Sequence, residues 1–252
     1  MPCVSIRSCR IGEGRPKVII PIVEHTETAV LERAAEFSTL DADCVEWRAD
    51  WLDNISDAQA LQRCLRGLRA ALGDKLLLVT FRTKAEGGEK PLSLTDYAAF
   101  CTAVCASGCA DILDIELFTA GDALPKMIAQ AHNSKLKVIC SSHDFNKTPS
   151  RTEMVSRMVQ MQKAGADIAK LAVMPQTRTD VLELLAATAE MTEHHPETPI
   201  VTMSMGALGA VSRLCGEAFG SAMTFASAGK TSAPGQIDLG TLNKCLDSLA
   251  VK

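Results

Sequence analysis

The stretch VICSSHDFNKTPSRTEMVSRMVQMQKAGADIAKLAV, residues 138–173, decides the fold class of this 252-residue chain. It begins and ends with short apolar runs, Val138–Ser142 and Ile168–Val173, that are typical of buried strands. Between them, Ser150-Arg151-Thr152-Glu153 has the pattern of a capping box and predicts the start of an amphipathic helix. A strand, a helix and a second strand in this order make one βα unit of a parallel sheet and the strand that follows it.

The same alternation recurs along the chain. Eight apolar runs are present: Val18–Val23, Cys44–Arg48, Leu76–Arg82, Ile112–Leu117, Val138–Ser142, Ile168–Val173, Ile200–Met205 and Ala222–Phe225. Their centres lie roughly 20 to 35 residues apart, which leaves room for a loop and a crossover helix after each strand. Amphipathic patterns predict helices at Thr28–Phe37, after a cap at Ser56-Asp57, and over Val181–Met191 behind Thr179-Asp180. The eight units predict an α/β fold, a single-domain (β/α)8 TIM barrel over residues 1–252.

The start of the chain carries two further signals. An open doubly wound sheet is the alternative fold, but the first run ends in PIVEH, Pro21–His25, without the Gly-rich turn that such sheets place there. The segment Val4–Arg10, followed by Gly12 and Gly14, is expected to form a β-hairpin that closes the N-terminal end of the barrel.

Composition and charge narrow the class of protein. The 26 Lys+Arg and 30 Asp+Glu residues give a formal net charge of −4, which offers no electrostatic basis for binding nucleic acid or an anionic membrane. No apolar stretch is long enough for a membrane span, and Met1–Arg7 lacks the apolar core of a secretory signal. The ten cysteines form no C-x-x-C pair, and Cys101, Cys105 and Cys109 are expected to pack inward from one helical face as free thiols. We therefore expect a cytoplasmic protein without a metal site.

Lys170 is the charged residue that fits its surroundings least. It lies inside the apolar run Ile168–Val173, and the carboxyl ends of such strands form the active-site face of a barrel. Burying a lone ammonium group is costly, so either a carboxylate such as Asp114 or Glu116 pairs with it, or the amine is used chemically. Burial lowers the pKa of a lysine, and the neutral amine can condense with a ketone to form a Schiff base.

His143 closes the preceding apolar run and is expected to face the same mouth as Lys170. A histidine at a strand end is often an ordinary surface residue. Beside a lysine that forms an iminium, however, it is well placed to take and return protons near neutral pH. One lysine and one histidine suffice for such chemistry without a metal or a cofactor.

The loops after the last two runs predict a site for an anionic group. Arg213 follows the seventh run, and Ser232–Gln236 (SAPGQ) follows the eighth. Barrels commonly hold a substrate's anionic group at these two loops, and an arginine can bind a carboxylate through two hydrogen bonds. Taken alone, Arg213 also fits an ordinary solvated helix residue, and Ser232–Gln236 also fits a plain polar turn.

Seven segments of the chain, taken in order, resemble the type I 3-dehydroquinate dehydratase family. They are Glu46-Trp47-Arg48, Thr80-Phe81-Arg82 with Glu86-Gly87-Gly88, Asp114-Ile115-Glu116-Leu117, His143-Asp144-Phe145 with Lys147-Thr148-Pro149, Lys170 with Met174-Pro175-Gln176, Met203-Ser204-Met205-Gly206, and Ser232-Ala233-Pro234-Gly235-Gln236. Each segment is a weak signal alone. Because they cover most of the chain in one consistent order, the chain is identified as a member of this family.

The resemblance implies a barrel, usually a homodimer, that dehydrates 3-dehydroquinate to 3-dehydroshikimate in the third step of the shikimate pathway. It implies that Lys170 forms the Schiff base with the substrate ketone, that His143 transfers the proton, and that Glu86 tunes the histidine. It implies no cofactor. Six residues would hold the substrate: Arg213, Ser232 and Gln236 at its carboxylate and neighbouring hydroxyl, and Glu46, Arg48 and Arg82 at the ring hydroxyls.

Two positions depart from the family pattern. Pro21 stands where several members have a serine, and Ser142 stands where many have Asn, His or Tyr before the histidine. Both departures concern substrate affinity and leave the Lys170–His143 pair intact.

Two alternatives to the dehydratase are a class I aldolase that uses the same lysine chemistry on the same fold, and a catalytically inactive barrel that binds a metabolite.

Overall fold

A parallel sheet forms the centre of the computed structural model, which describes residues 2–251. Its strands pair in the order β11-β10-β3-β4-β5-β6-β7-β8-β9. Their bounds are β3 Lys17–Ile22, β4 Cys44–Arg48, β5 Leu76–Thr80, β6 Ile112–Glu116, β7 Lys137–Asp144, β8 Ile168–Val173, β9 Ile200–Ser204, β10 Met223–Ser227 and the short β11 Ile237–Asp238. A parallel bridge between Ile200 and Ser221 joins the start of β9 to the start of β10. The eight strands β3 to β10 therefore close into the predicted TIM barrel.

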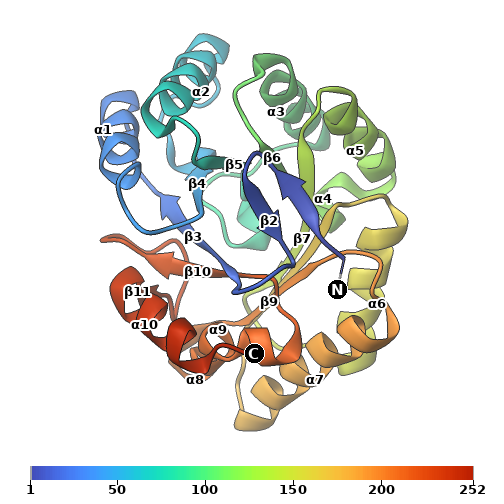
Figure 1. Cartoon of the computed structure of the whole chain (residues 1–252). Coiled ribbons are helices and arrows are strands. Elements are labelled where there is room, and N and C mark those ends of the chain that lie inside the picture. Colours follow the sequence, from blue (N-terminus) through green and yellow to red (C-terminus); the bar gives the residue numbers. More distant parts are fainter. Residues whose placement is uncertain (1, 252) are drawn as a thin grey trace.

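Helices surround the barrel, as Figure 1 shows in a view along its axis. Their bounds are α1 Glu27–Phe37, α2 Ala58–Leu72, α3 Leu94–Ser107, α4 Leu117–Ala120, α5 Leu124–Asn133, α6 Arg151–Lys163, α7 Arg178–His194, α8 Gly206–Gly209, α9 Val211–Leu214 and α10 Leu239–Leu249. Outward-facing strand residues and inward-facing helix residues form one continuous apolar layer between them. Within residues 2–251, no helix is both long enough and apolar enough to cross a membrane.

Two expectations about helix ends need correction. The helix expected behind Thr179-Asp180 begins earlier, at Arg178, because Thr177 is its N-cap. Asp180 is the third helical residue, where its carboxylate accepts the Thr177 backbone N–H at 3.0 Å and completes a capping box. Helix α3 ends at Ser107, so Cys109 lies beyond the helix, although its thiol is buried like those of Cys101 and Cys105.

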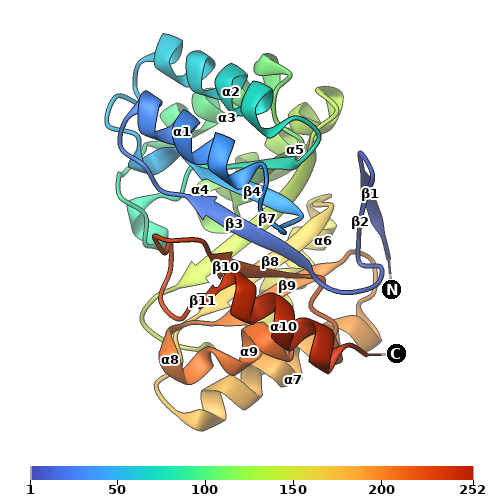
Figure 2. The ribbon, with the colours of Figure 1, turned by 60° about the vertical axis from the view of Figure 1, so that its left-hand side comes forward.

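The expected N-terminal hairpin is present. Strands β1 (Val4–Ile6) and β2 (Cys9–Ile11) pair antiparallel. Ile6 and Ile11 are buried in an apolar cluster with residues near the starts of the barrel strands, including Ile19 of β3. Figure 2 shows the hairpin beyond the ends where the strands begin. It therefore closes the bottom of the barrel and leaves the opposite end for the site.

Three aspartates form hydrogen bonds between neighbouring strands at the end of the barrel that the hairpin covers. Asp43, Asp111 and Asp167 directly precede β4, β6 and β8. Each carboxylate accepts a backbone N–H from the preceding strand, at Val18 (2.8 Å), Leu77 (2.9 Å) and Val138 (2.8 Å) respectively. These contacts satisfy amides that would otherwise be unpaired at the edge of the ladder. They help to fix the register that brings the opposite strand ends to one level.

Candidate active site

The carboxyl ends of the strands surround one cavity, and it contains all the side chains that the sequence nominated. Its lining includes Glu46, Arg48, Arg82, Glu86, His143, Lys170, Arg213, Ser232 and Gln236. They come from four strands or the loops after them (β4, β5, β7 and β8) and from the α9 and β10–β11 segments. The parallel sheet brings them together because every strand ends at the same face of the barrel.

Lys170 lies in the middle of β8, where its register partners are Ser141 and Val201. Its side chain is only 5% exposed, and Nζ lies 3.8 Å from Asp114 Oδ2 and 4.3 Å from the centre of the Phe225 ring. The ion pair with Asp114 that the sequence left open is therefore present, at a distance beyond that of a hydrogen bond. Burial lowers the pKa of Lys170 below its usual value, which favours the neutral, nucleophilic amine.

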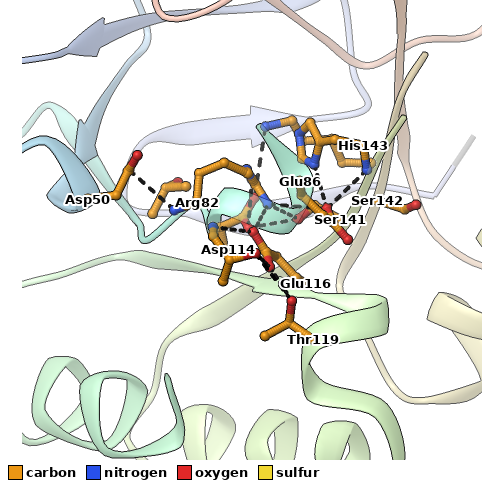
Figure 3. A network of polar contacts seen from close by, with 12 residues as sticks. Asp50, Arg82, Glu86, Asp114, Glu116, Thr119, Ser141, Ser142 and His143 are labelled. Atoms are coloured by element: carbon orange, nitrogen blue, oxygen red, sulfur yellow. Dashed lines mark hydrogen bonds and ion pairs between the residues drawn. The ribbon is translucent and has the colours of Figure 1, made fainter. Parts of the chain in front are cut away.

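His143 lies near the end of β7 and contacts Glu86, as Figure 3 shows. Its Nδ1 is 2.9 Å from Glu86 Oε2, and the same oxygen accepts the His143 backbone N–H at 3.0 Å. An oxygen that accepts the backbone N–H is best matched by a ring that donates from Nδ1, which leaves Nε2 as a proton acceptor. Burial, with the positive charges of Arg82 and Lys170, lowers the pKa of His143 well below its usual value.

Glu86 occupies a short 3₁₀ turn, Lys84–Glu86, after β5. Burial raises the pKa of its carboxyl to about 8, against the opposing effect of Arg82, whose Nη1 is 3.6 Å from Oε2. Oε1 is buried and makes no hydrogen bond within residues 2–251. The Glu86–His143 pair thus has one oxygen engaged and one free, in a site where burial disfavours a charge on either partner.

Arg82 is bound by the two carboxylates of β6. Its Nη2 donates to Asp114 Oδ1 at 2.9 Å, and its Nη1 donates to Glu116 Oε1 at 2.9 Å and to Ser141 Oγ at 3.0 Å. Asp114 and Glu116, two residues apart on β6, therefore lie on the same face of the strand. Arg82 therefore lines the cavity with its guanidinium already paired (Figure 3).

Arg213 differs from Arg82 in that no carboxylate pairs with it within residues 2–251. Its side chain comes from α9, donates from Nη2 to the Pro234 carbonyl at 3.2 Å, and leaves Nε buried without a partner. Burial lowers the pKa of Arg213 to about 10, still far above neutral. The cavity thus holds a buried, unneutralised cation, which would favour an anionic ligand.

The segment after β10 covers this cation. Gln236 Oε1 accepts the Ser232 backbone N–H at 2.9 Å, and its Nε2 donates to Ser232 Oγ at 3.0 Å. Arg48 Nη1 contacts the Ser232 carbonyl at 3.3 Å, and the Gly206 N–H contacts the Pro234 carbonyl at 3.1 Å. The expected grouping of Arg213, Ser232 and Gln236 at one end of the cavity is what the structure has.

Sequence reasoning missed several polar side chains that support these residues. Asp50 pairs with Arg48 through two hydrogen bonds of 2.8 Å, and Thr80 Oγ1 donates to Glu46 Oε1 at 2.9 Å. Asp50 follows Arg48 by two residues, a local signal for this pair. Ser141, Thr83 and Thr119 also join the network around Glu116 and Asp114, and nothing in the sequence marks them. Within residues 2–251, no cluster of three or more His, Cys, Asp or Glu side chains is arranged to hold a metal ion.

Comparisons with known proteins agree on one family. The model of the family "Type I 3-dehydroquinase" matches residues 18–252. A 3-dehydroquinate dehydratase from Bacillus licheniformis is 47% identical over 246 residues, which cover 98% of this chain and 97% of that protein.

Two solved structures are similar over nearly the whole chain. The type I 3-dehydroquinate dehydratase from Clostridium difficile, solved with covalently modified comenic acid, has a TM-score of 0.95 at 43% identity and covers 98% of this chain and 97% of its own. The 3-dehydroquinate dehydratase from Enterococcus faecalis has a TM-score of 0.93 at 43% identity, with 98% of this chain and 100% of that chain covered.

Proposed function

The chain belongs to the type I 3-dehydroquinase family and is a dehydratase of that type, and we propose that it removes water from 3-dehydroquinate through an imine on Lys170. The observation that carries this mechanism is the meeting, in one cavity, of a buried lysine, a histidine with a free Nε2 and an unpaired arginine. An amine of lowered pKa supplies the nucleophile, and the unpaired cation supplies the counterion for the acid.

In the proposed reaction, neutral Lys170 attacks the ketone to give a carbinolamine, whose hydroxyl takes up one proton from solvent and leaves as water, so that a protonated imine remains; the final hydrolysis returns that proton. His143 Nε2 then removes a proton from the adjacent carbon, whose electrons move into the iminium to give an enamine. The enamine expels the hydroxyl group on the next carbon, and this group leaves as water with the proton that His143 returns. Hydrolysis of the conjugated iminium restores the lysine and releases 3-dehydroshikimate.

The other cavity residues would bind and orient the substrate. We propose that Arg213 binds the carboxylate while Ser232 and Gln236 donate to it or to the neighbouring hydroxyl. Glu46 and Arg48 would contact the ring hydroxyls. Because Arg82 already donates to Asp114 and Glu116, a hydroxyl that binds there must share those donors.

The biological setting is part of the same proposal. As a dehydratase of this family the enzyme would serve the third step of the shikimate pathway, as a cytoplasmic homodimer of one 252-residue domain. No cofactor enters the reaction as written, because the lysine supplies the electron sink. The unpaired Arg213 and the family match favour the dehydratase over the aldolase and over an inactive barrel.

The proposal is tested by following the conjugated enone of the product by ultraviolet absorbance. Lys170→Ala should abolish turnover because no imine forms, and His143→Ala should abolish turnover while still forming the imine. Lys244→Ala, an exposed lysine on α10, is the matched control and should retain wild-type rates. Normal turnover by Lys170→Ala would rule out the imine mechanism, and normal turnover by His143→Ala would rule out its role in proton transfer.

A further inference from the structure

Asp50 receives more hydrogen bonds than its pairing with Arg48 requires. It lies in the 3₁₀ turn Ala49–Trp51 after β4 and is fully buried. Oδ1 accepts Arg48 Nε at 2.8 Å and the backbone N–H of Arg82 at 3.3 Å. Oδ2 accepts Arg48 Nη2 at 2.8 Å and the backbone N–H of Glu89 at 3.1 Å. One carboxylate thus holds a side chain of the cavity and two backbone amides of another segment.

Those two amides lie at the two ends of the loop that carries Glu86. The loop is closed on itself, because the Gly88 N–H donates to the Thr83 carbonyl at 2.9 Å. It is also tightly folded, since a Cβ added at Gly88 would lie 1.9 Å from the Arg82 carbonyl oxygen. Asp50 therefore fixes both ends of a compact loop whose centre presents Glu86 to His143 (Figure 3).

We propose that Asp50 is a positioning residue that holds Arg48 and the Arg82–Glu89 segment in the arrangement needed for turnover. Its two oxygens link the side chain proposed to bind a ring hydroxyl with the loop whose Glu86 contacts the proton-transferring histidine. The inference rests on the proposed function, because it assigns to Asp50 an effect on both substrate binding and proton transfer.

The chemistry of the four donors explains why an amide would not replace this carboxylate. An asparagine at position 50 would have one oxygen acceptor and one NH2 donor in place of two oxygen acceptors. In one orientation the NH2 group faces Arg48 Nε and the Arg82 N–H, and in the other it faces Arg48 Nη2 and the Glu89 N–H. In both, two donors lose their acceptor, and the buried guanidinium of Arg48 loses its counterion. Arg48 and the loop should both shift.

The test compares Asp50→Asn, Arg48→Ala and the double variant by KM and kcat. Arg48→Ala should mainly raise KM. Asp50→Asn should raise KM and also lower kcat, with kcat/KM falling about 10- to 100-fold, the scale expected for displacing groups by up to an ångström. In the double variant, kcat should be as low as in Asp50→Asn. A double variant with the kcat of Arg48→Ala would overturn the link to the loop.

A matched control separates positioning from simple structural support. Asp111 is a partly buried carboxylate that likewise accepts two arginines and a backbone amide, but it lies at the bottom of the barrel. Asp111→Asn should lower the melting temperature and keep wild-type KM and kcat. If Asp50→Asn does the same, with KM and kcat unchanged below its melting temperature, the positioning role is wrong.

A second variant covers the case in which Asp50→Asn does not fold. Gly88→Ala displaces the loop backbone without altering Asp50 or Arg48, and it should lower kcat with little change in KM. Gly240→Ala on α10, where a Cβ meets only Asp238 Oδ1 at 3.4 Å, is its control. Unchanged kcat in Gly88→Ala would overturn the proposal. Borohydride trapping of the wild type tests the imine separately, so a failure of the mechanism is distinguishable from a failure of the role of Asp50.

Discussion

At the scale of single residues, two cations of the cavity, Lys170 and Arg213, lack a close carboxylate partner within residues 2–251. Lys170 has Asp114 only at 3.8 Å, and Arg213 has no carboxylate within the described part of the chain. A barrel that served only stability would replace such groups with apolar side chains, because buried charges cost more than they return. The proposed substrate, which would bring a ketone to Lys170 and a carboxylate to Arg213, gives both groups a use.

The Glu86–His143 contact leads to a pH prediction. Glu86 has a pKa of about 8, raised by burial, so its carboxyl is protonated below that pH and ionised above it. The ionised carboxylate accepts a hydrogen bond from the Nδ1–H of His143, and its negative charge stabilises the imidazolium that forms when Nε2 takes a proton. We therefore expect kcat/KM to rise with pH through about 8 in the wild type.

Glu86→Gln distinguishes this ionisation from that of Lys170, which also favours activity at high pH. The glutamine keeps the size of the side chain and cannot ionise, so the rise near pH 8 should disappear. The measurement is the pH profile of kcat/KM for both proteins. If the pH profile of Glu86→Gln is unchanged, the rise of kcat/KM with pH belongs to the ionisation of Lys170 instead.

Sequence reasoning found the residues that break a local pattern and missed those that do not. Lys170 and His143 interrupt or end apolar runs, so they stand out from their neighbours. Glu86 came only from the family resemblance, because the contact that explains it spans 57 residues of chain. Asp50 was missed, although it follows Arg48 by only two residues, because its other two donors come from a segment more than thirty residues away.

At the scale of elements, the eight strands and the main helices were predictable because their apolar periodicity is local. Their ends were less so. Strand β7 continues to Asp144 through its pairing with β8, although the apolar run stops earlier. The start of α7 was misplaced because Thr177 and Thr179 are both plausible caps, and only the contact with Asp180 selects the first. The aspartates at the strand starts escaped notice, since their partners lie on neighbouring strands.

The hairpin supplies a prediction at this scale. Ile11 is fully buried against the first residues of the barrel strands. Ile11→Ala should lower the free energy of unfolding by about 2–5 kcal/mol, the range for removing a buried aliphatic side chain. Because the hairpin and the cavity lie at opposite ends of the barrel, KM should not change.

Urea unfolding and steady-state kinetics on the same preparation check this prediction. Ser5→Ala, an exposed position on the same hairpin, is a suitable control and should leave stability unchanged. Wild-type stability in Ile11→Ala would mean that the hairpin does not pack into the barrel in solution.

At the scale of the whole molecule, closure of the sheet is what turns scattered residues into one site. The Ile200–Ser221 bridge joins β9 to β10, and this brings Lys170 on β8 within reach of Phe225 on β10. Because the strands are parallel, polar side chains from β4, β5, β7, β8 and the loops that follow them lie at one end of the barrel, while the hairpin covers the other end. That residues 1–252 form one domain, and that two chains pair, stay predictions from the sequence.

The central claim is that Lys170 forms an imine with 3-dehydroquinate, and one measurement tests it most directly. Wild type and Lys170→Ala are incubated with 3-dehydroquinate and borohydride, and the intact proteins are weighed by mass spectrometry. Reduction converts an imine into a stable amine, so the wild type should gain the mass of the reduced ligand and Lys170→Ala should gain none. A folded wild type that gains no mass from verified substrate, or an equal gain in Lys170→Ala, would contradict the account.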